Sequence, residues 1–85
     1  MRKVFKYVMA DVVSLPLDHK IIMTAKQDGL WHIWVEFEDV NESNTVEVAF
    51  KVFGTGHRIS KEWVHLHSYI ERPFVWHIYW SFVNQ

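Results

Sequence analysis

The segment "KIIMTAKQDGLWHIWVEFE", residues 20–38, decides the fold because it reads as two β-strands joined by a tight turn. Asp28-Gly29 is a dipeptide that favours hairpin turns, since both residues tolerate the positive φ angles that such turns require. Side chains of a strand point alternately to its two faces. One face of the second half is apolar throughout: Trp31, Ile33, Val35 and Phe37. The segment therefore predicts a β-hairpin with one buried face.

The length of the turn decides which side chains of residues 20–27 lie beside this apolar face. A strict two-residue turn places Ile22, Thr24 and Lys26 there. A type I turn followed by a Gly bulge shifts the register by one residue and places Ile21, Met23 and Ala25 there. Because the second register buries more apolar side chains, we predict a bulged turn with Gly29 at positive φ.

The same alternation recurs along the chain, and helical spacing is rare. The side chains predicted to face the core are Phe5, Tyr7, Met9, Val46, Val48, Phe50, Val52, Val64, Leu66, Ser68, Ile70, Phe74, Trp76, Ile78, Trp80 and Phe82. We predict a single all-β domain over residues 1–85, with about six short antiparallel strands in a meander and at most one short helical turn. An open sheet of this size would leave exposed edges, so closure into a small barrel or sandwich is expected.

Composition limits the functional classes. Hydrophobic residues make up 49% of the 85 residues, and the formal net charge is −1, so nucleic acid is not the expected partner. The absence of cysteine excludes disulfides and thiolate metal sites and fits a reducing cytoplasm. No apolar run approaches the roughly 20 residues that cross a bilayer, so no membrane is expected. No serine or threonine lies in a recognisable nucleophile motif, and we expect no enzymatic activity.

Several large side chains fall on faces opposite the apolar stripes: Trp34, Phe53, Tyr69, Val75, Tyr79 and Val83. An 85-residue chain has little material left to cover them. We interpret part of this set as a contact surface for another molecule.

Three histidines add to this surface. If the last hairpin has a loop centred on Arg72, His67 lies opposite His77, and His65 lies on the same face. Three imidazoles can bind zinc, but no carboxylate is supplied beyond Glu71. We therefore expect no metal, and interpret the histidines as part of a pH-sensitive aromatic surface.

The segment "FGTGHRI", residues 53–59, has two interpretations. Gly54 and Gly56 allow backbone N–H groups to converge on an anion, with His57 and Arg58 supplying charge. Alternatively, the glycines form a tight corner between strands. No helix follows, so neither a dinucleotide motif nor a phosphate-binding loop is predicted.

The chain also resembles a known group of proteins. The motifs "VFKY", "SLP", "FGTGH" (Phe53–His57) and "FVWHIY", whose "FVWH" part is Phe74–His77, resemble an uncharacterised family of small all-β proteins encoded by tailed phages and prophages. His65 and His67 lie outside this pattern. The resemblance implies an accessory protein in the host cytoplasm that binds and inhibits or redirects a host protein, including proteins of antiviral defence.

These observations give one principal hypothesis and two alternatives, none of which needs a cofactor. The principal hypothesis is a non-enzymatic binding protein that contacts a host protein through an aromatic-rich β surface. Its expected contact residues are Trp34, Trp63, His65, His67, Tyr69, His77 and Tyr79. One alternative is a protein that binds a small nucleotide-like ligand through the following residues: Gly54, Thr55, Gly56, His57 and Arg58. The other is a virion or assembly component that buries its outer face in a homo-oligomer.

Overall fold

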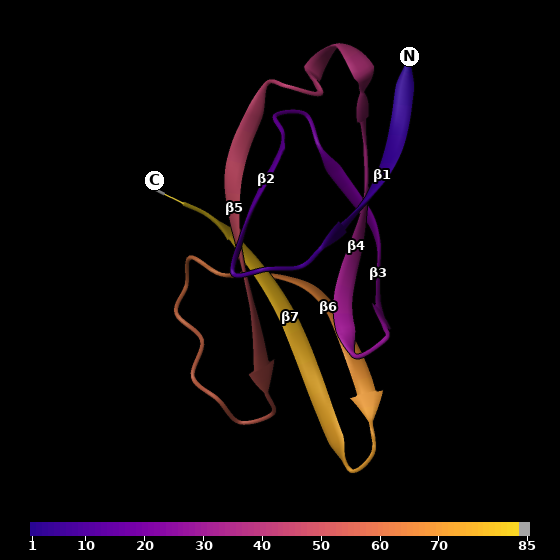
Figure 1. The fold of residues 1–85 in the computed structure, drawn as a ribbon. Coiled ribbons are helices and arrows are strands. Elements are labelled where there is room, and N and C mark those ends of the chain that lie inside the picture. The colour runs from indigo at the N-terminus through magenta and orange to yellow at the C-terminus, as the bar shows by residue number, and fades with distance from the viewer. Residues whose placement is uncertain (84–85) are drawn as a thin grey trace.

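A computed structural model describes residues 1–83 and contains seven strands and one short 3-10 helix (Figure 1). The elements are β1 (Arg2–Val8), β2 (Val12–Pro16), β3 (Lys20–Gln27), β4 (Leu30–Glu38), η1 (Asp39–Asn41), β5 (Thr45–Gly54), β6 (Val64–Glu71) and β7 (Phe74–Phe82). The all-β class is confirmed. Within the described part of the chain, no helix is long and apolar enough to cross a membrane.

The strands form two antiparallel sheets, with the orders β1-β4-β3 and β2-β5-β7-β6. We name them sheet A and sheet B. The chain crosses between them after β1, after β2 and after β4, so the strand order is not that of a simple meander. Of the two closures expected from the sequence, the structure is therefore the sandwich. It is a flat one, with principal extents of 42 × 30 × 15 Å.

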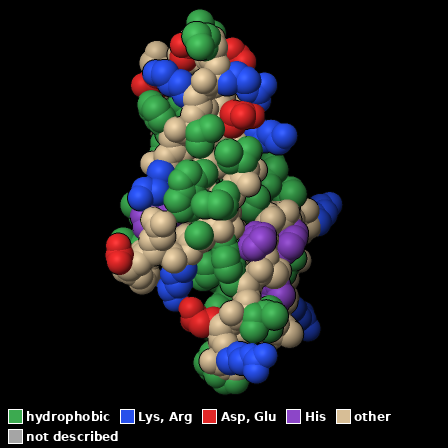
Figure 2. Space-filling model, turned by 90° about the vertical axis from the view of Figure 1, so that its right-hand side faces the viewer, with side chains coloured by type: hydrophobic (Ala, Val, Ile, Leu, Met, Phe, Trp, Pro, Cys, Tyr) green, Lys and Arg blue, Asp and Glu red, His purple; other side chains and the backbone are tan. Residues whose placement is uncertain are grey.

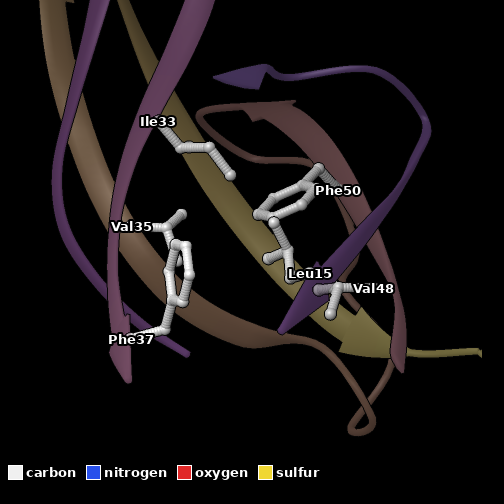
Figure 3. Close-up of a cluster of buried hydrophobic side chains, with 6 residues drawn as sticks. All are labelled: Leu15, Ile33, Val35, Phe37, Val48 and Phe50. Atoms are coloured by element: carbon white, nitrogen blue, oxygen red, sulfur yellow. The ribbon is translucent and has the colours of Figure 1, made fainter. Parts of the chain in front are cut away.

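The core lies between the two sheets, where apolar side chains of β4 face those of β2 and β5. Ile33, Val35 and Phe37 project from β4 toward side chains of β2 and β5 (Figure 3). The buried cluster consists of Leu15, Ile33, Val35, Phe37, Val48 and Phe50. Tyr7 and Met9 pack against it, as the alternation in the N-terminal segment predicted.

The β3–β4 hairpin combines a tight turn with a bulge elsewhere. Gln27 pairs with Leu30, and Asp28 and Gly29 have φ angles of 53° and 80°, as in a type I′ turn. The positive φ of Gly29 is confirmed, but the bulge predicted at the turn is absent. The irregularity lies instead between Ile21 and Met23. Ile21 pairs with Val35 as predicted, but Thr24 and Lys26 pair with Ile33 and Trp31, so the prediction that Met23 and Ala25 lie beside the apolar face is wrong.

The β6–β7 hairpin also departs from the predicted register. Its turn is Arg72–Pro73, with a cis peptide bond between them, and Glu71 pairs with Phe74. A second bulge lies between His65 and His67. His67 therefore pairs with Ile78 rather than with His77.

The bulge in β6 reverses the facing of all the residues that follow it, since one extra residue shifts the alternation by one. Ser68 pairs with His77 and Ile70 pairs with Val75, so both lie on the outer face of sheet B. Tyr69 pairs with Trp76 and faces the space between the sheets. The prediction that Ser68 and Ile70 face the core is wrong, and so is the prediction that Tyr69 lies on the outer face.

Candidate functional site

A row of aromatic and histidine rings lies on the outer face of sheet B. Phe53, at the end of β5, is only 6% exposed because Trp63 and Tyr79 pack on it, with ring centroids 6.0 and 5.4 Å away. The ring of His65 lies 5.2 Å from that of Tyr79 and 6.5 Å from that of His77. We call this row, Trp63, His65, Tyr79 and His77 above Phe53, the histidine face.

The rings are held in place by a chain of side-chain hydrogen bonds. Ser68 Oγ lies 2.8 Å from His65 Nε2 and 2.7 Å from His77 Nδ1, and Thr55 Oγ1 lies 3.0 Å from His77 Nε2. The single hydroxyl proton of Ser68 can be donated to only one of the two rings. The other ring must therefore donate its own N–H to Ser68 Oγ, so the two histidines orient each other through the serine.

Histidine side chains also gather visibly on part of the molecular surface, close to exposed apolar side chains (Figure 2). On the outer face of sheet B, the apolar surface beyond the histidine face is provided by Ile70 and its partner Val75. Ile70 is 77% exposed. A large aliphatic side chain this exposed beside fixed rings extends the contact surface along the hairpin.

A cavity of about 490 Å³ adjoins the histidine face at the end of β5. We call it the motif pocket, and it is lined by Gly54, Thr55, His57, Pro73, Phe74, Val75 and Trp76. It exists because β5 ends at Gly54, opposite Trp76, while β7 begins earlier, at Phe74. Phe74 and Val75 pair with β6 and have no β5 partner in the described ladder.

The turn from Gly54 to His57, which we call the glycine loop, supplies one wall of the motif pocket. His57 N–H donates to Gly54 O (3.3 Å), and Gly54 N–H donates to His57 Nδ1 (3.2 Å), so the loop turns back on itself. A Cβ at Gly54 would lie 3.3 Å from His57 Cε1 and 3.6 Å from the Trp76 ring. Gly56 has a φ of 92°, which favours glycine. The segment thus forms the glycine corner that was one of its two interpretations.

The seven residues predicted to contact a partner do not form one surface. Trp63, His65, His77 and Tyr79 come together on the histidine face. Trp34 lies on the opposite side of the molecule, on the outer face of sheet A, with its ring 6.0 Å from Lys6 Nζ. Tyr69 turns toward the space between the sheets, and His67 lies on the same side of β6 but is exposed at the edge of the sheet.

Tyr69 serves as a link between the two sheets. Its ring centroid lies 4.4 Å from that of Trp31 in sheet A, and its hydroxyl forms a hydrogen bond with Thr24 Oγ1 in β3. His67 lies next to it, with the two ring centroids 4.6 Å apart. His67 also lines a small cavity of about 80 Å³ beside β3. The bond from Tyr69 to Thr24 connects the edge strands β6 and β3 and gives Tyr69 a structural role, whereas His67 is exposed and its ring contacts that of Tyr69 in the same strand.

Sequence reasoning did not identify Ser68 as the residue between the two histidines. The alternation in β6 pointed Ser68 toward the core, and only a bulge, which the alternation does not reveal, turns it outward. It also did not include Phe74 and Trp76 as neighbours of the glycine loop. The shared motifs "FGTGH" and "FVWH" could have suggested this, since they are the two segments that meet at the pocket.

Ionisable groups are not arranged as a metal site. In residues 1–83, no three His, Cys, Asp or Glu side chains converge so that they could hold an ion. One carboxylate near the glycine loop has a shifted pKa: Ser60 Oγ donates to Glu62 at 2.6 Å and lowers the pKa of that carboxyl. This bond lies in the loop that leads from the glycine loop to Trp63.

Comparison with known proteins gives a family and no relative of established activity. No curated protein and no solved structure matches the chain. The family model described as a domain of unknown function (DUF7352) matches residues 1–84, and the chain belongs to this family.

Proposed function

We propose that this protein is a non-enzymatic accessory protein that binds a host macromolecule through the histidine face and blocks or redirects it. The observation that carries the proposal is the row of fixed rings from Trp63 to His77 above Phe53. Tyrosine and tryptophan are enriched at protein-binding hot spots because they bury a large area with few rotatable bonds. The phage resemblance suggests that the partner is a host protein.

The rigidity of the histidine face supports binding by preformed contacts. Ser68 and Thr55 fix the imidazoles, while Phe53 fixes Trp63 and Tyr79 from below. Side chains that are already ordered lose less conformational entropy when a partner covers them. Ile70 and Val75 add an apolar surface that the partner can desolvate.

Charge near this face favours a protein over a nucleic acid. The nearest Lys in the β5–β7 pairing is Lys51, opposite Tyr79, and its Nζ lies 5.3 Å from the centre of the Phe53 ring. Binding to nucleic acid normally uses a basic groove that follows the phosphate backbone. Strands β5, β6 and β7 carry one lysine between them, and Arg58 and Arg72 lie in the loops at the strand ends, so no row of basic side chains follows the rings. This arrangement is a better match for a mixed polar and aromatic protein interface.

Native mass spectrometry of complexes captured from host lysate tests this proposal. The wild-type chain is compared with Tyr79→Ala, which removes the centre of the histidine face, and with Trp34→Ala, which truncates an aromatic residue on the other sheet. We expect a stoichiometric host protein with the wild type and with Trp34→Ala, and its loss with Tyr79→Ala.

The folded state of both variants is checked by thermal melting, so that lost capture is not confused with unfolding. Capture that survives Tyr79→Ala but is lost with Trp34→Ala would move the binding surface to sheet A. A homo-oligomer in solution that is dissociated by Tyr79→Ala would instead assign the histidine face to self-association.

A further inference from the structure

The motif pocket has the size of a small-molecule site. Its volume of about 490 Å³ lies within the range of about 300–1,000 Å³ that is typical of ligand pockets. Two segments of the chain form it, and they meet where Gly54 pairs with Trp76, 22 residues later in the sequence. The "FGTGH" and "FVWH" motifs supply most of its lining. The function proposed for the adjoining histidine face does not require a ligand in this cavity.

The walls of the pocket favour a flat aromatic ring. Phe74 is 56% exposed, and its ring centroid lies 5.6 Å from that of Trp76, with an angle of 34° between the planes. The imidazole of His57 lies over Gly54, next to the ring of Trp76. Aromatic rings that line one cavity offer faces on which a planar heterocycle can stack.

The charges around the pocket favour an anion. None of the residues that line it is Asp or Glu, and the surrounding segments 53–60 and 72–77 contain neither. Glu71, at the end of β6, is paired with Lys26 Nζ at 3.1 Å. Arg58 and Arg72 directly flank the lining residues His57 and Pro73, and neither arginine forms an ion pair with any residue in the range 1–83.

The glycine loop adds hydrogen-bond donors. The two hydrogen bonds that close the loop join Gly54 and His57 and do not use the N–H groups of Thr55 and Gly56. With Gly56 at a φ of 92°, the loop has the kind of backbone turn in which successive N–H groups can face an anion.

We propose that the motif pocket binds a small molecule that joins a planar heteroaromatic ring to an anionic group, which is the chemistry of a nucleoside monophosphate. The ring stacks on Phe74 and Trp76, and the phosphate lies at the loop near Arg58. This site adjoins the host-protein surface proposed above and shares Thr55 and Val75 with it. Its contacts at Phe74, Trp76 and Arg58 lie outside that surface, so the two proposals can fail independently.

Chemical-shift mapping of the full chain with matched ligands tests the site. The probes are adenosine monophosphate and uridine monophosphate, with adenosine and uridine as ring-only controls and ribose 5-phosphate as the phosphate-only control. We expect the nucleotides to bind with a Kd of about 1 mM or tighter and to shift the amide signals of residues 54–58 and 73–76. Each half of the ligand alone should bind at least about tenfold more weakly.

Two variants at exposed residues, each with a matched control, test the stacking contact and the phosphate contact. Phe74→Ala and Arg58→Ala should each weaken nucleotide binding by about tenfold. Phe82→Ala, at the other end of β7, and Lys61→Ala, in the same loop as Arg58, should leave it unchanged. The dispersion of the amide spectrum shows that each variant is folded.

Three results would overturn the proposal. They are no binding of either nucleotide, equal binding of nucleoside and nucleotide, and equal binding of ribose 5-phosphate and nucleotide. Shifts that spread over sheet A rather than residues 54–58 and 73–76 would also overturn it, because they would place the ligand elsewhere.

Discussion

The two tyrosines on the β6–β7 hairpin should respond very differently to removal of the hydroxyl group. The Tyr69 hydroxyl bonds to Thr24 Oγ1 in the other sheet. The Tyr79 hydroxyl forms no hydrogen bond with any residue in the range 1–83. Tyr69→Phe therefore removes a link between the sheets, whereas Tyr79→Phe removes a hydroxyl that makes no hydrogen bond within residues 1–83.

The size of the effect follows from the hydrogen bond and its burial. A net intramolecular hydrogen bond contributes about 0.5–1.5 kcal/mol to the free energy of unfolding. Both partners are partly buried, so we expect Tyr69→Phe to cost about 1 kcal/mol. For a domain of this size, that loss lowers the Tm by about 4–8 °C. The ring of Tyr69 keeps its contact with Trp31, so the variant remains folded.

Urea denaturation followed by tryptophan fluorescence measures this difference. A double-mutant cycle with Thr24→Val isolates the hydrogen bond, since either single change already removes it. We expect Tyr69→Phe and Thr24→Val each to be destabilising and the double variant to be only slightly worse than either, with a coupling energy of about 1 kcal/mol. Tyr79→Phe should stay within about 0.5 kcal/mol of the wild type.

Two outcomes would refute this reasoning. Strictly additive effects of Tyr69→Phe and Thr24→Val would mean that the two hydroxyls do not interact. A larger loss with Tyr79→Phe than with Tyr69→Phe would mean that the bulge in β6 has been placed wrongly and that the two faces are exchanged.

Three further predictions concern packing, turn geometry and pH. Ile78→Val removes a methylene from a side chain that is 0% exposed and should cost about 0.5–1.5 kcal/mol in urea unfolding, whereas Ile70→Val, at 77% exposed, should change nothing measurable. Gly29→Ala should destabilise the protein by about 1–2 kcal/mol because alanine is disfavoured at a φ of 80°, and unchanged stability would argue against the type I′ turn. Asp18 Oδ2 accepts a hydrogen bond from Glu38 N–H at 3.0 Å, which lowers the pKa of that carboxyl from its ordinary value of 3.8. The resulting stability is present above pH 3.8 and is lost as the pH falls through the lowered pKa. Asp18→Asn should therefore reduce the fall of the Tm at acidic pH. An unchanged fall of the Tm in this variant would contradict the prediction.

The sequence determined the class of fold because β-strand alternation is a local property. Most of the apolar stripes of residues 31–37, 46–52 and 74–82 face the space between the sheets, as predicted, whereas Phe74, at the start of β7, is 56% exposed and lines the motif pocket. The Asp28-Gly29 turn was also readable, since positive φ at Gly29 depends on residues that are adjacent in the chain.

The candidate sites were only partly predictable. Sequence reasoning selected Trp63, His65, His77 and Tyr79, which meet on the histidine face, and the glycine loop, which lines the motif pocket. It joined Trp34, His67 and Tyr69 to the same surface, and the structure separates them. A regular alternation extended through β6 assigns every residue after the bulge to the wrong face.

Only the tertiary structure decided where the bulges lie and what they bring together. A bulge places one extra residue in one strand, and whether it forms depends on which side chains its partner strands and the opposite sheet can bury. In β3 it brings Ile21 opposite Val35, and in β6 it turns Tyr69 toward Trp31 and Ser68 toward His77. These choices depend on contacts between residues tens of positions apart in the chain, and no local pattern in the sequence encodes them.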